Sequence, residues 1–350
     1  MARSRSWRVL AAASVLVLAL GACGGDDDDD SGSDATGGGS GSSGVTITGS
    51  STVEPISSRV AELFNQENAD VPIDVSGPGT GDGFEIFCAG EADITDASRP
   101  ISEEEVVLCE DAGVEFVELK VAIDGLAVIT STNNDAVECL SFADLYALLG
   151  PEAQGETWAD ADDLAGELPE GFGTVNAPYP DAPLVIAGPG EESGTYDSFV
   201  DLALADIAEE RGLAEEEIAT RPDYQASPND NVIVEAIGGT DTSLGWVGYA
   251  FAAENEETIQ TLAVDGGDGC IEDSEETIRS GEYPLARDLF IYVNVAKAEE
   301  NSNVAAFVDL YLSDEGIASV SDAGYVDLAE EDLTATRDAW DSRTTGTNVG

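Results

Sequence analysis

The sequence of 350 residues contains no histidine, and its 13 lysine and arginine residues face 72 aspartate and glutamate residues. The lack of histidine excludes imidazole-based catalytic triads and histidine metal sites. A formal net charge of −59 excludes nucleic-acid binding, because almost no positive charge is available to neutralise a phosphate backbone. Hydrophobic residues nevertheless make up 42% of the chain and follow regular patterns, which is typical of a folded protein. The acidity therefore indicates a solvated acidic surface, of a kind suited to high salt.

Three of the few basic residues precede an apolar run from Val9 to Leu20. A basic start followed by about a dozen apolar residues is typical of an export signal. The run is too short for a membrane-spanning helix, which needs about 20 apolar residues. We therefore predict a signal peptide over residues 1–22, and removal of its three arginines would change the formal net charge from −59 to −62. Residues 23–44 contain Asp26 to Asp30 and many glycines and serines, so we expect a disordered acidic tether.

The segment Leu20-Gly21-Ala22-Cys23 closes the apolar run and resembles the lipobox of bacterial lipoproteins. In that motif the cysteine is acylated and becomes the new N-terminus. We therefore predict an exported protein that lipidated Cys23 anchors to the outer face of the cytoplasmic membrane. The alternative is an ordinary secretory signal that contains an incidental cysteine.

Four further cysteines are present, at Cys88, Cys109, Cys139 and Cys270. An even number of cysteines in an oxidising compartment suggests disulfides, and four cysteines allow three pairings. Because Cys88 and Cys109 bracket a short local unit, we favour Cys88–Cys109 together with Cys139–Cys270. Free buried thiols are the alternative.

Strand-like and helix-like patterns alternate beyond the tether, which predicts an α/β protein with largely parallel sheets. Strands are expected at 45–48, 71–75, 114–123, 126–130, 184–187, 244–249 and 289–295, with a short one within 92–100. Helices are expected from Ser51, from Ser102 and after Thr195, and at 140–149, 161–168, 231–237, 305–312 and 315–320. The start at Ser51 rests on a capping box with Glu54. The segment from residue 45 to residue 350 exceeds the usual size of one domain, so two domains are expected.

Three junctions share one design, in which a strand ends in small residues and a helix begins. They are Gly49-Ser-Ser-Thr-Val53, Gly77-Pro-Gly-Thr-Gly81 and Glu192-Ser-Gly-Thr195. Helix N-termini present unpaired N–H groups and a positive dipole end, and adjoining hydroxyls complete a cradle for a tetrahedral oxyanion. Ordinary capping and turn chemistry explains each junction alone. Three of them at the carboxyl ends of predicted strands indicate an anion site.

The order of the motifs resembles the phosphate-binding lipoproteins of the high-affinity phosphate ABC transporter, the PstS family. The resemblance covers residues 45 to about 345 and is carried by Gly49–Val53, Gly79–Cys88, Gly90–Ile101, Glu192–Phe199 and Asp230-Asn231. It implies a two-lobed α/β fold of the periplasmic-binding-protein type II, in which two crossover strands join lobes that close over dehydrated phosphate. It also implies a monomeric, non-enzymatic receptor without cofactor or metal, which delivers inorganic phosphate to the permease and ATPase subunits of an importer.

The lobe boundaries follow from the same resemblance. Lobe one would comprise residues 45–122 and 288–345, and lobe two residues 123–287. The crossovers would be the strands Leu119–Ile123 and Leu289–Tyr292, since the loops near Arg99 and Glu192 must face each other across a cleft.

The resemblance also implies which residues bind the ligand. Ser51, Thr52 and Val53 match the first phosphate loop, Thr80 matches the second, and Ser193, Gly194 and Thr195 match the third; the small loop Ser98-Arg99 and Glu192 complete the predicted set.

The chain departs from the family pattern at two positions. It has Pro189 where many members have arginine, and Arg99 where many have aspartate. Arg99 is therefore expected to supply the only full positive charge of the site, because a guanidinium fork suits oxyanions. Its alternative role is a surface salt bridge. The proton of hydrogen phosphate would then be accepted by Glu192, with Asp96 and Asp230 as rivals.

Three other functions fit parts of the sequence. A receptor for sulfate or molybdate would use the same hydroxyl and N–H donors. An exported phosphatase could use Ser51 or Ser193 as nucleophile, although the lack of histidine and of an evident metal cluster argues against it. A cell-surface interaction module would leave the three anion loops unexplained.

Overall fold

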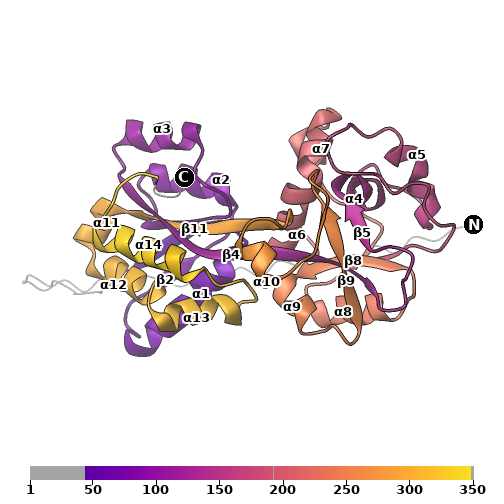
Figure 1. Ribbon diagram of the computed structural model, residues 1–350. Helices are drawn as coiled ribbons and strands as arrows, with labels where there is room; N and C mark the ends of the chain where they lie inside the picture. The colour runs from indigo at the N-terminus through magenta and orange to yellow at the C-terminus, as the bar shows by residue number, and fades with distance from the viewer. Residues whose placement is uncertain (1–43, 192, 348–350) are drawn as a thin grey trace, which may run out of the picture. The chain divides into compact units, whose positions relative to one another are not determined.

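The computed structural model describes residues 44–191 and 193–347 (Figure 1). The predictions for the signal peptide, for Cys23, for nearly all of the tether and for Glu192 lie outside the described residues. Among the described residues, no helix combines the length and the apolar character that crossing a membrane requires.

The first group of strands forms a sheet in the order β2-β1-β3-β11-β4. Its members are β1 (Val45–Gly49), β2 (Ile73–Val75), β3 (Ile94–Ala97), β4 (Phe116–Ser131) and β11 (Ala286–Asn294). Strand β1 runs parallel to β2 and β3, whereas β11 is antiparallel to both β3 and β4.

Strand β4 also belongs to the second group, because its partner changes along its length. It pairs with β11 from Phe116 to Gly125, and from Leu126 onward it pairs with strands of the second group. That group comprises β5 (Cys139–Ser141), β6 (Val185–Gly188), β7 (Gln225–Ala226), β8 (Ser243–Gly248), β9 (Ile259–Asp265) and β10 (Cys270–Ile271). Figure 1 shows β4 running from one group into the other.

The helices fall into two sets along the chain. Those around the first sheet are α1 (Glu54–Glu67), α2 (Thr80–Cys88), α3 (Glu103–Ala112), α11 (Val295–Glu300), α12 (Ser302–Tyr311), α13 (Asp314–Asp322) and α14 (Glu330–Asp341). The others are α4 (Phe142–Leu149), α5 (Asp162–Ala165), α6 (Gly194–Phe199), α7 (Ala205–Glu210), α8 (Asp230–Gly238), α9 (Tyr249–Ala253) and α10 (Glu275–Arg279). Short turns are η1 (Trp158–Ala161), η2 (Val200–Leu204) and η3 (Glu215–Glu217).

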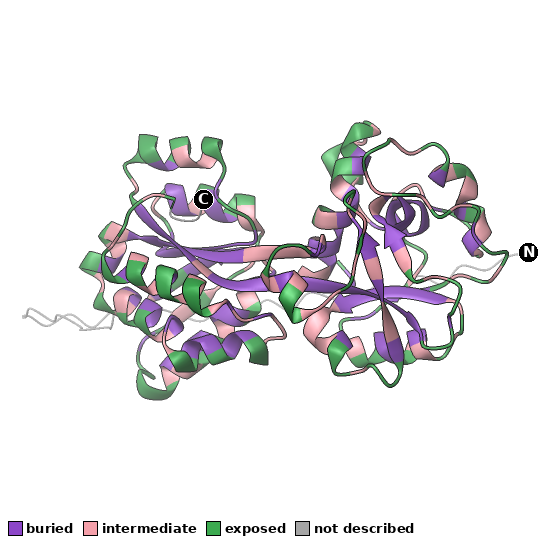
Figure 2. Cartoon of the chain, viewed as in Figure 1, coloured by how far each residue is buried: buried purple, intermediate pink, exposed green. Residues whose placement is uncertain are grey.

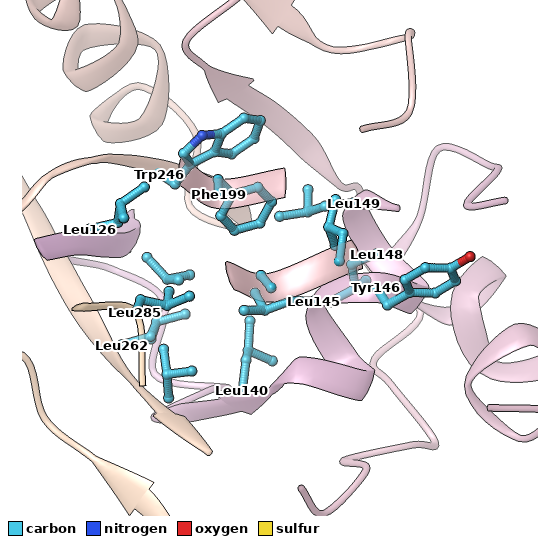
Figure 3. Packing of buried hydrophobic residues seen from close by; sticks show 14 of the residues in the cluster. Leu126, Leu140, Leu145, Tyr146, Leu148, Leu149, Phe199, Trp246, Leu262 and Leu285 are labelled. Carbon is cyan, nitrogen blue, oxygen red and sulfur yellow. The ribbon is translucent and has the colours of Figure 1, made fainter. Parts of the chain in front are cut away.

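Separate hydrophobic clusters fill the two groups, and β4 contributes to both (Figure 2). Val121 packs with β1, α1 and α12, whereas Leu126 packs with the β8 and α4 residues. In the second cluster the rings of Phe199 and Trp246 stack with centroids 4.5 Å apart (Figure 3). Burial of such large apolar side chains is the main force that stabilises each group.

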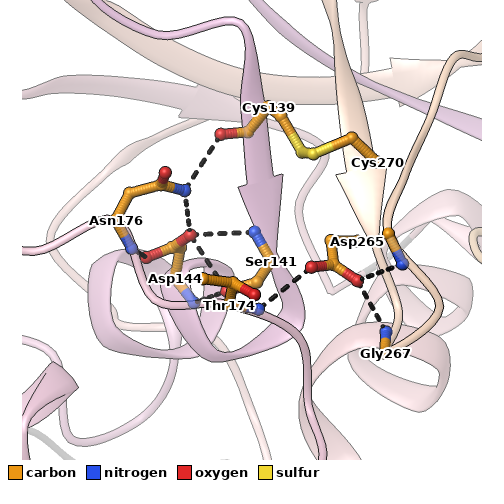
Figure 4. Close-up of a disulfide and its surroundings, with 9 residues drawn as sticks. Cys139, Ser141, Asp144, Thr174, Asn176, Asp265, Gly267 and Cys270 are labelled. Atoms are coloured by element: carbon orange, nitrogen blue, oxygen red, sulfur yellow. Dashed lines mark hydrogen bonds between the residues drawn. A yellow bond between two sulfur atoms is a disulfide. The ribbon is translucent and has the colours of Figure 1, made fainter.

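Two disulfides are present, and they are the pairs that the sequence favours. Cys88–Cys109 joins α2 to α3 with a Cα–Cα distance of 4.4 Å, and Cys139–Cys270 joins β5 to β10 at 6.1 Å. Beside the second disulfide, Asp265 accepts hydrogen bonds from backbone N–H groups that include that of Gly267 (Figure 4). One disulfide thus links two elements within each group, and the second lies close to a hydrogen-bonded loop.

The structure differs from the sequence predictions in several places, among them the sheets, the start of α1 and the closing helix. The sheets are mixed rather than largely parallel, because the segments predicted as two strands at 114–123 and 126–130 form one long strand, β4, and β11 returns antiparallel to it. Helix α1 begins at Glu54 and not at Ser51, since the Ser51 hydroxyl bonds across the cleft instead of capping the helix. The closing helix α14 was not predicted, because its acidic sequence buries only Thr336 and Trp340.

Candidate anion-binding site

The first loop leaves β1 at Gly49, whose φ of 126° favours glycine. A Cβ at this position would lie 2.1 Å from the backbone oxygen of Asp96, so the chain can lie this close to β3 only where it has no side chain. The backbone N–H of Ser50 then donates to that oxygen at 2.8 Å. This contact fixes Ser51 and Thr52 at the carboxyl end of β1.

The second loop lies against the first. The N–H of Gly79 donates to the backbone oxygen of Gly49 at 2.9 Å, and α2 begins at the next residue, Thr80. The Thr80 hydroxyl lies 3.1 Å from the Ser98 hydroxyl and accepts the Ser98 N–H at 3.2 Å. Hydroxyl groups from the ends of three neighbouring strands are therefore gathered at one edge of the first sheet.

The third loop, between β6 and α6, contacts the first. Its N-cap Ser193 accepts the N–H of Thr195 at 3.2 Å. A Cβ at Gly194 would lie 2.7 Å from the Thr52 Cα, and the Thr52 hydroxyl donates to the Gly194 oxygen at 3.2 Å. Loops from the two strand groups thus meet at Thr52.

A cleft of about 840 Å³ opens beside this contact. Five of the predicted residues line it, namely Ser51, Thr52, Thr80, Ser98 and Arg99. Val53 is fully buried in the first core, and its N–H donates to the Ser50 oxygen. A separate cavity of about 480 Å³ beside Trp158 contains none of the predicted site residues.

Arg99 reaches this cleft with its charge already paired. Its two terminal nitrogens each donate to a different carboxylate oxygen of Glu105 at 2.8 Å, and its side chain is 46% exposed. Hydrogen bonding with Glu105 raises the pKa of Arg99. Burial alone would raise the pKa of Glu105, but the hydrogen bonds from Arg99 and the Ser102 N–H lower it. Arg99 therefore forms the salt bridge that was its alternative role, at the rim of the cleft.

A second arginine, Arg287, lines the same cleft, so the prediction that Arg99 supplies its only positive charge is wrong. Arg287 lies on β11 directly opposite Asp124 of β4. Its side chain is 11% exposed, and its Nη2 donates to the hydroxyls of Thr52 at 3.1 Å and Ser198 at 2.5 Å. No motif marks this residue in the sequence; only the scarcity of basic residues singles it out.

The carboxyl groups near the cleft differ from those expected. Neither Asp96 nor Asp230 is among the cleft-lining residues. Asp96 is fully buried beneath the first loop, where it accepts the Ser57 hydroxyl, and burial raises its pKa well above the ordinary value. Asp197 does line the cleft and accepts the Ser51 hydroxyl at 2.5 Å. Burial raises the pKa of Asp197, against the opposing hydrogen bond from Ser51.

The donor groups of the cleft can be compared with what a metal ion and an anion each require. No group of three or more carboxylate or cysteine side chains within residues 44–191 and 193–347 is placed to hold a metal ion. The donors at the cleft are hydroxyls, backbone N–H groups and guanidinium groups, which suit an oxyanion.

Comparisons with known proteins agree with this geometry. Residues 33–315 match the family model described as a PBP superfamily domain. The chain is 34% identical over 310 residues to protein SphX of Synechocystis sp., covering 88% of this chain and 85% of the relative. It is 32% identical over 289 residues to the phosphate-binding protein PstS of Staphylococcus saprophyticus, covering 82% and 81%.

Solved structures give the same result. A crystal structure of a possible phosphate binding protein from Planctomyces limnophilus superposes with a TM-score of 0.76 at 33% identity, covering 87% of this chain and 99% of that one. An ABC-type phosphate transport receptor from Vibrio cholerae shares the fold at a TM-score of 0.59 and 21% identity, covering 81% and 99%.

The fold is therefore that of a type II periplasmic binding protein, which is the class of extracytoplasmic solute-binding receptors. Within that class the chain belongs to the PstS and SphX family of ABC-transporter substrate-binding proteins, whose members are receptors and not enzymes. The fold class and the family resemblance predicted from the sequence are confirmed.

Proposed function

We propose that this chain captures inorganic phosphate in the cleft and delivers it to the permease and ATPase subunits of an ABC importer. The observation that carries the proposal is that the second and third strand–loop–helix junctions both contact the first, the second at Gly49 and the third at Thr52. Their hydroxyl and N–H groups offer many donors to one small anion, and two arginines line the same cleft. The names of the relatives support the same ligand.

In the proposed complex the first two loops bind phosphate through Ser51, Thr52, Thr80 and Ser98. The N–H of Val53 would join them only by leaving the Ser50 oxygen. The third loop contributes Glu192, Ser193, Gly194 and Thr195, and Arg99 assists from the rim. The 840 Å³ cleft is far larger than one phosphate ion, so binding requires the loops to approach further. Hinge closure between two lobes provides such a movement.

The lobes would be residues 45–122 with 288–345, and residues 123–287. The change of partners within β4 supports this division, because the strand leaves β11 after Gly125 and joins β8 at Leu126. Strands β4 and β11 would then act as the two crossovers about which the lobes rotate.

Selectivity for phosphate over sulfate requires an acceptor for the ligand's proton, since donors treat both anions alike. We infer that Asp197 serves this purpose beside Glu192, because it lines the cleft and Asp96 and Asp230 do not. Its carboxylate accepts the Ser51 hydroxyl, so it is held at the cleft as an acceptor, and Ser51 can turn its proton to the ligand only by leaving Asp197. Sulfate would leave that acceptor unpaired in a desolvated site, which is costly.

The remaining parts of the proposal concern location. The signal peptide would direct export, and the lipid on Cys23 would hold the receptor as a monomer at the outer face of the cytoplasmic membrane. Mass spectrometry of the mature N-terminus tests the lipid, and sedimentation tests the monomer.

Calorimetric titration of the mature protein with phosphate, sulfate and molybdate tests the central claim. We expect one phosphate to bind per chain and the other two anions to bind far more weakly. Tighter binding of sulfate or molybdate would make the chain a receptor for that anion. Turnover of a phosphate monoester that is lost in the Ser51→Ala or Ser193→Ala variant would make it a phosphatase.

A further inference from the structure

Arg287 contacts elements of both strand groups at once. Its Nη2 donates to the hydroxyl of Thr52, in the loop after β1, and to that of Ser198, in α6. Its Nη1 donates to Asp201, in η2, at 3.0 Å. The residue thus joins the first loop to the helix that follows the third loop, at the point where both border the cleft.

The strand that carries Arg287 explains why it can hold this position. Arg287 faces Asp124 across the β11–β4 pair, on the two strands that we propose as crossovers. Its Nε lies 3.7 Å from the Asp124 Oδ2, and Asp124 is 6% exposed. Because β4 pairs with β11 at this residue, the backbone of Arg287 is held at the proposed hinge while loops on either side approach its guanidinium.

The hydrogen bonds of Arg287 determine which way the hydroxyl protons point. A guanidinium only donates, so the hydroxyls of Thr52 and Ser198 must both accept from it and keep their own protons for other partners. Ser198 gives its proton to Asp124 at 2.6 Å. Thr52 has the long 3.2 Å bond to the Gly194 oxygen and lies 3.3 Å from the Ser198 hydroxyl, and an anion oxygen would easily replace either contact. Arg287 therefore turns Thr52 into a donor toward the cleft.

Part of the charge of Arg287 is also available to a ligand, because its ion pair with Asp124 spans 3.7 Å without a hydrogen bond. Its Nε is buried and makes no hydrogen bond, and the carboxylate bound to its Nη1, that of Asp201, is 60% exposed. An exposed ion pair contributes little free energy, so an incoming anion can replace Asp201 at small cost. By contrast, Arg99 has both of its terminal nitrogens bound to Glu105.

We propose that Arg287 is the residue that binds the ligand's negative charge and couples it to closure. On binding, its fork exchanges Asp201 for an oxygen of the anion while Nη2 keeps Thr52 and Ser198. The loops of both lobes are then held on one ligand by one side chain. The inference rests on the proposed function, since it assigns a binding role within that cleft.

The test compares phosphate affinity by calorimetry, and compaction by small-angle scattering, in the mature wild type and in variants. We expect Arg287→Gln to bind phosphate about 30-fold or more weakly and to lose compaction, as for a truncated buried charge pair. Arg287→Lys should recover part of the affinity, because it restores the charge without the fork. Arg337→Gln is the matched control. Because Arg337 pairs with Asp314 away from the cleft, this variant should bind phosphate within about twofold of the wild-type affinity.

A second variant gives an effect of opposite sign. Asp201→Asn removes the carboxylate that competes for Arg287 and should strengthen phosphate binding. In the Arg287→Gln background the same substitution should produce a clearly smaller gain, because there is no guanidinium left to release. Equal gains in both backgrounds would mean that Asp201 acts only as a general negative charge, and would overturn the proposed exchange.

The outcomes separate this inference from the proposed function. If the wild type does not bind phosphate, the proposed function fails. If the wild type binds and Arg287→Gln binds equally well and still compacts, only the role of Arg287 fails. Thermal unfolding of each variant shows that it is folded; if Arg287→Gln is unfolded, the comparison of wild type, Arg287→Lys and Asp201→Asn decides, and unchanged affinity in both would overturn the inference.

Discussion

The two arginines of the cleft carry the same charge in very different surroundings. Arg99 lies at the rim, almost half exposed, with its fork closed by Glu105, only six residues along the chain. Arg287 is nearly buried, and its partners come from Thr52, Ser198 and Asp201, all far away in sequence. The charge that a site offers to a ligand therefore depends on how its partners are arranged more than on how many arginines line it.

The largest expected effect on phosphate affinity comes from separating the first and third loops, which meet beside Arg287. Gly194→Ala would place a methyl group 2.7 Å from the Thr52 Cα and so push apart the loops that Arg287 joins. Overpacking of this kind typically costs 1–3 kcal/mol, which corresponds to phosphate affinity lowered by about 5- to 150-fold. Calorimetry measures the loss.

The control for this substitution is Gly166→Ala, where the added Cβ meets ordinary contacts of 3.5 Å. It should leave phosphate affinity unchanged. Binding that survives in Gly194→Ala would mean that the bound state does not need this close approach, and the distinction between the two ends of the cleft would lose its structural basis.

The next effect concerns selectivity. Asp197→Asn replaces an acceptor by an amide that can donate, so sulfate should gain relative to phosphate by about tenfold, as for one hydrogen bond to a charged group. Competition titrations with both anions give the ratio. Glu192→Gln is the parallel variant, and if it alone shifts the ratio, the acceptor role belongs to Glu192.

The loop hydroxyls of the cleft and Arg287 also differ in what sequence reasoning could find. Ser51, Thr52 and Thr80 belong to strand–loop–helix junctions, which local chemistry marks, and the structure gathers all three at the cleft together with Ser98 of the small loop. Arg287 carries no such mark, because its role depends on the antiparallel register of β11 with β4.

The fold shows the same limit. Sequence patterns predicted most elements, including the start of α3, where Ser102 is the expected N-cap and also forms a capping box with Glu105. They could not predict that β4 is one strand shared by two groups, because hydrophobic alternation does not reveal which partner a strand has. Asp197 was missed for a similar reason: its importance comes from the Ser51 hydroxyl, 146 residues away.

A smaller effect on phosphate affinity should appear when Arg99 is released from its salt bridge with Glu105. Glu105→Gln keeps a side chain that can cap α3 but removes the charge that binds Arg99. Phosphate affinity should rise by about threefold, since a rim charge contributes less than 1 kcal/mol. Calorimetry with Glu104→Gln, a neighbouring acidic residue outside this salt bridge, is the control. A loss of affinity in Glu105→Gln would show that Arg99 needs Glu105 to be positioned.

The same pair predicts a pH dependence of stability. The pKa of Glu105 is lowered in the folded state, so the folded state binds fewer protons than the unfolded state near and below the ordinary value of 4.5. The stabilisation is therefore present at neutral pH and is lost as the pH falls through the lowered pKa. Urea unfolding should show wild type more stable than Glu105→Gln at pH 7, with the difference shrinking in acid; a constant difference would contradict the assignment.

The smallest expected effect separates the two arginines by salt. Because the formal net charge is −59, and −62 once the proposed signal peptide is removed, phosphate is repelled at long range, and association should speed up modestly as salt screens the repulsion. The contribution of half-exposed Arg99 should fade under the same conditions, whereas that of buried Arg287 should persist. Stopped-flow binding of phosphate at low and high salt would therefore show Arg99→Ala converging on wild type while Arg287→Lys stays weaker. Equal salt responses in the two variants would mean that salt screens both charges equally, and that burial does not distinguish them.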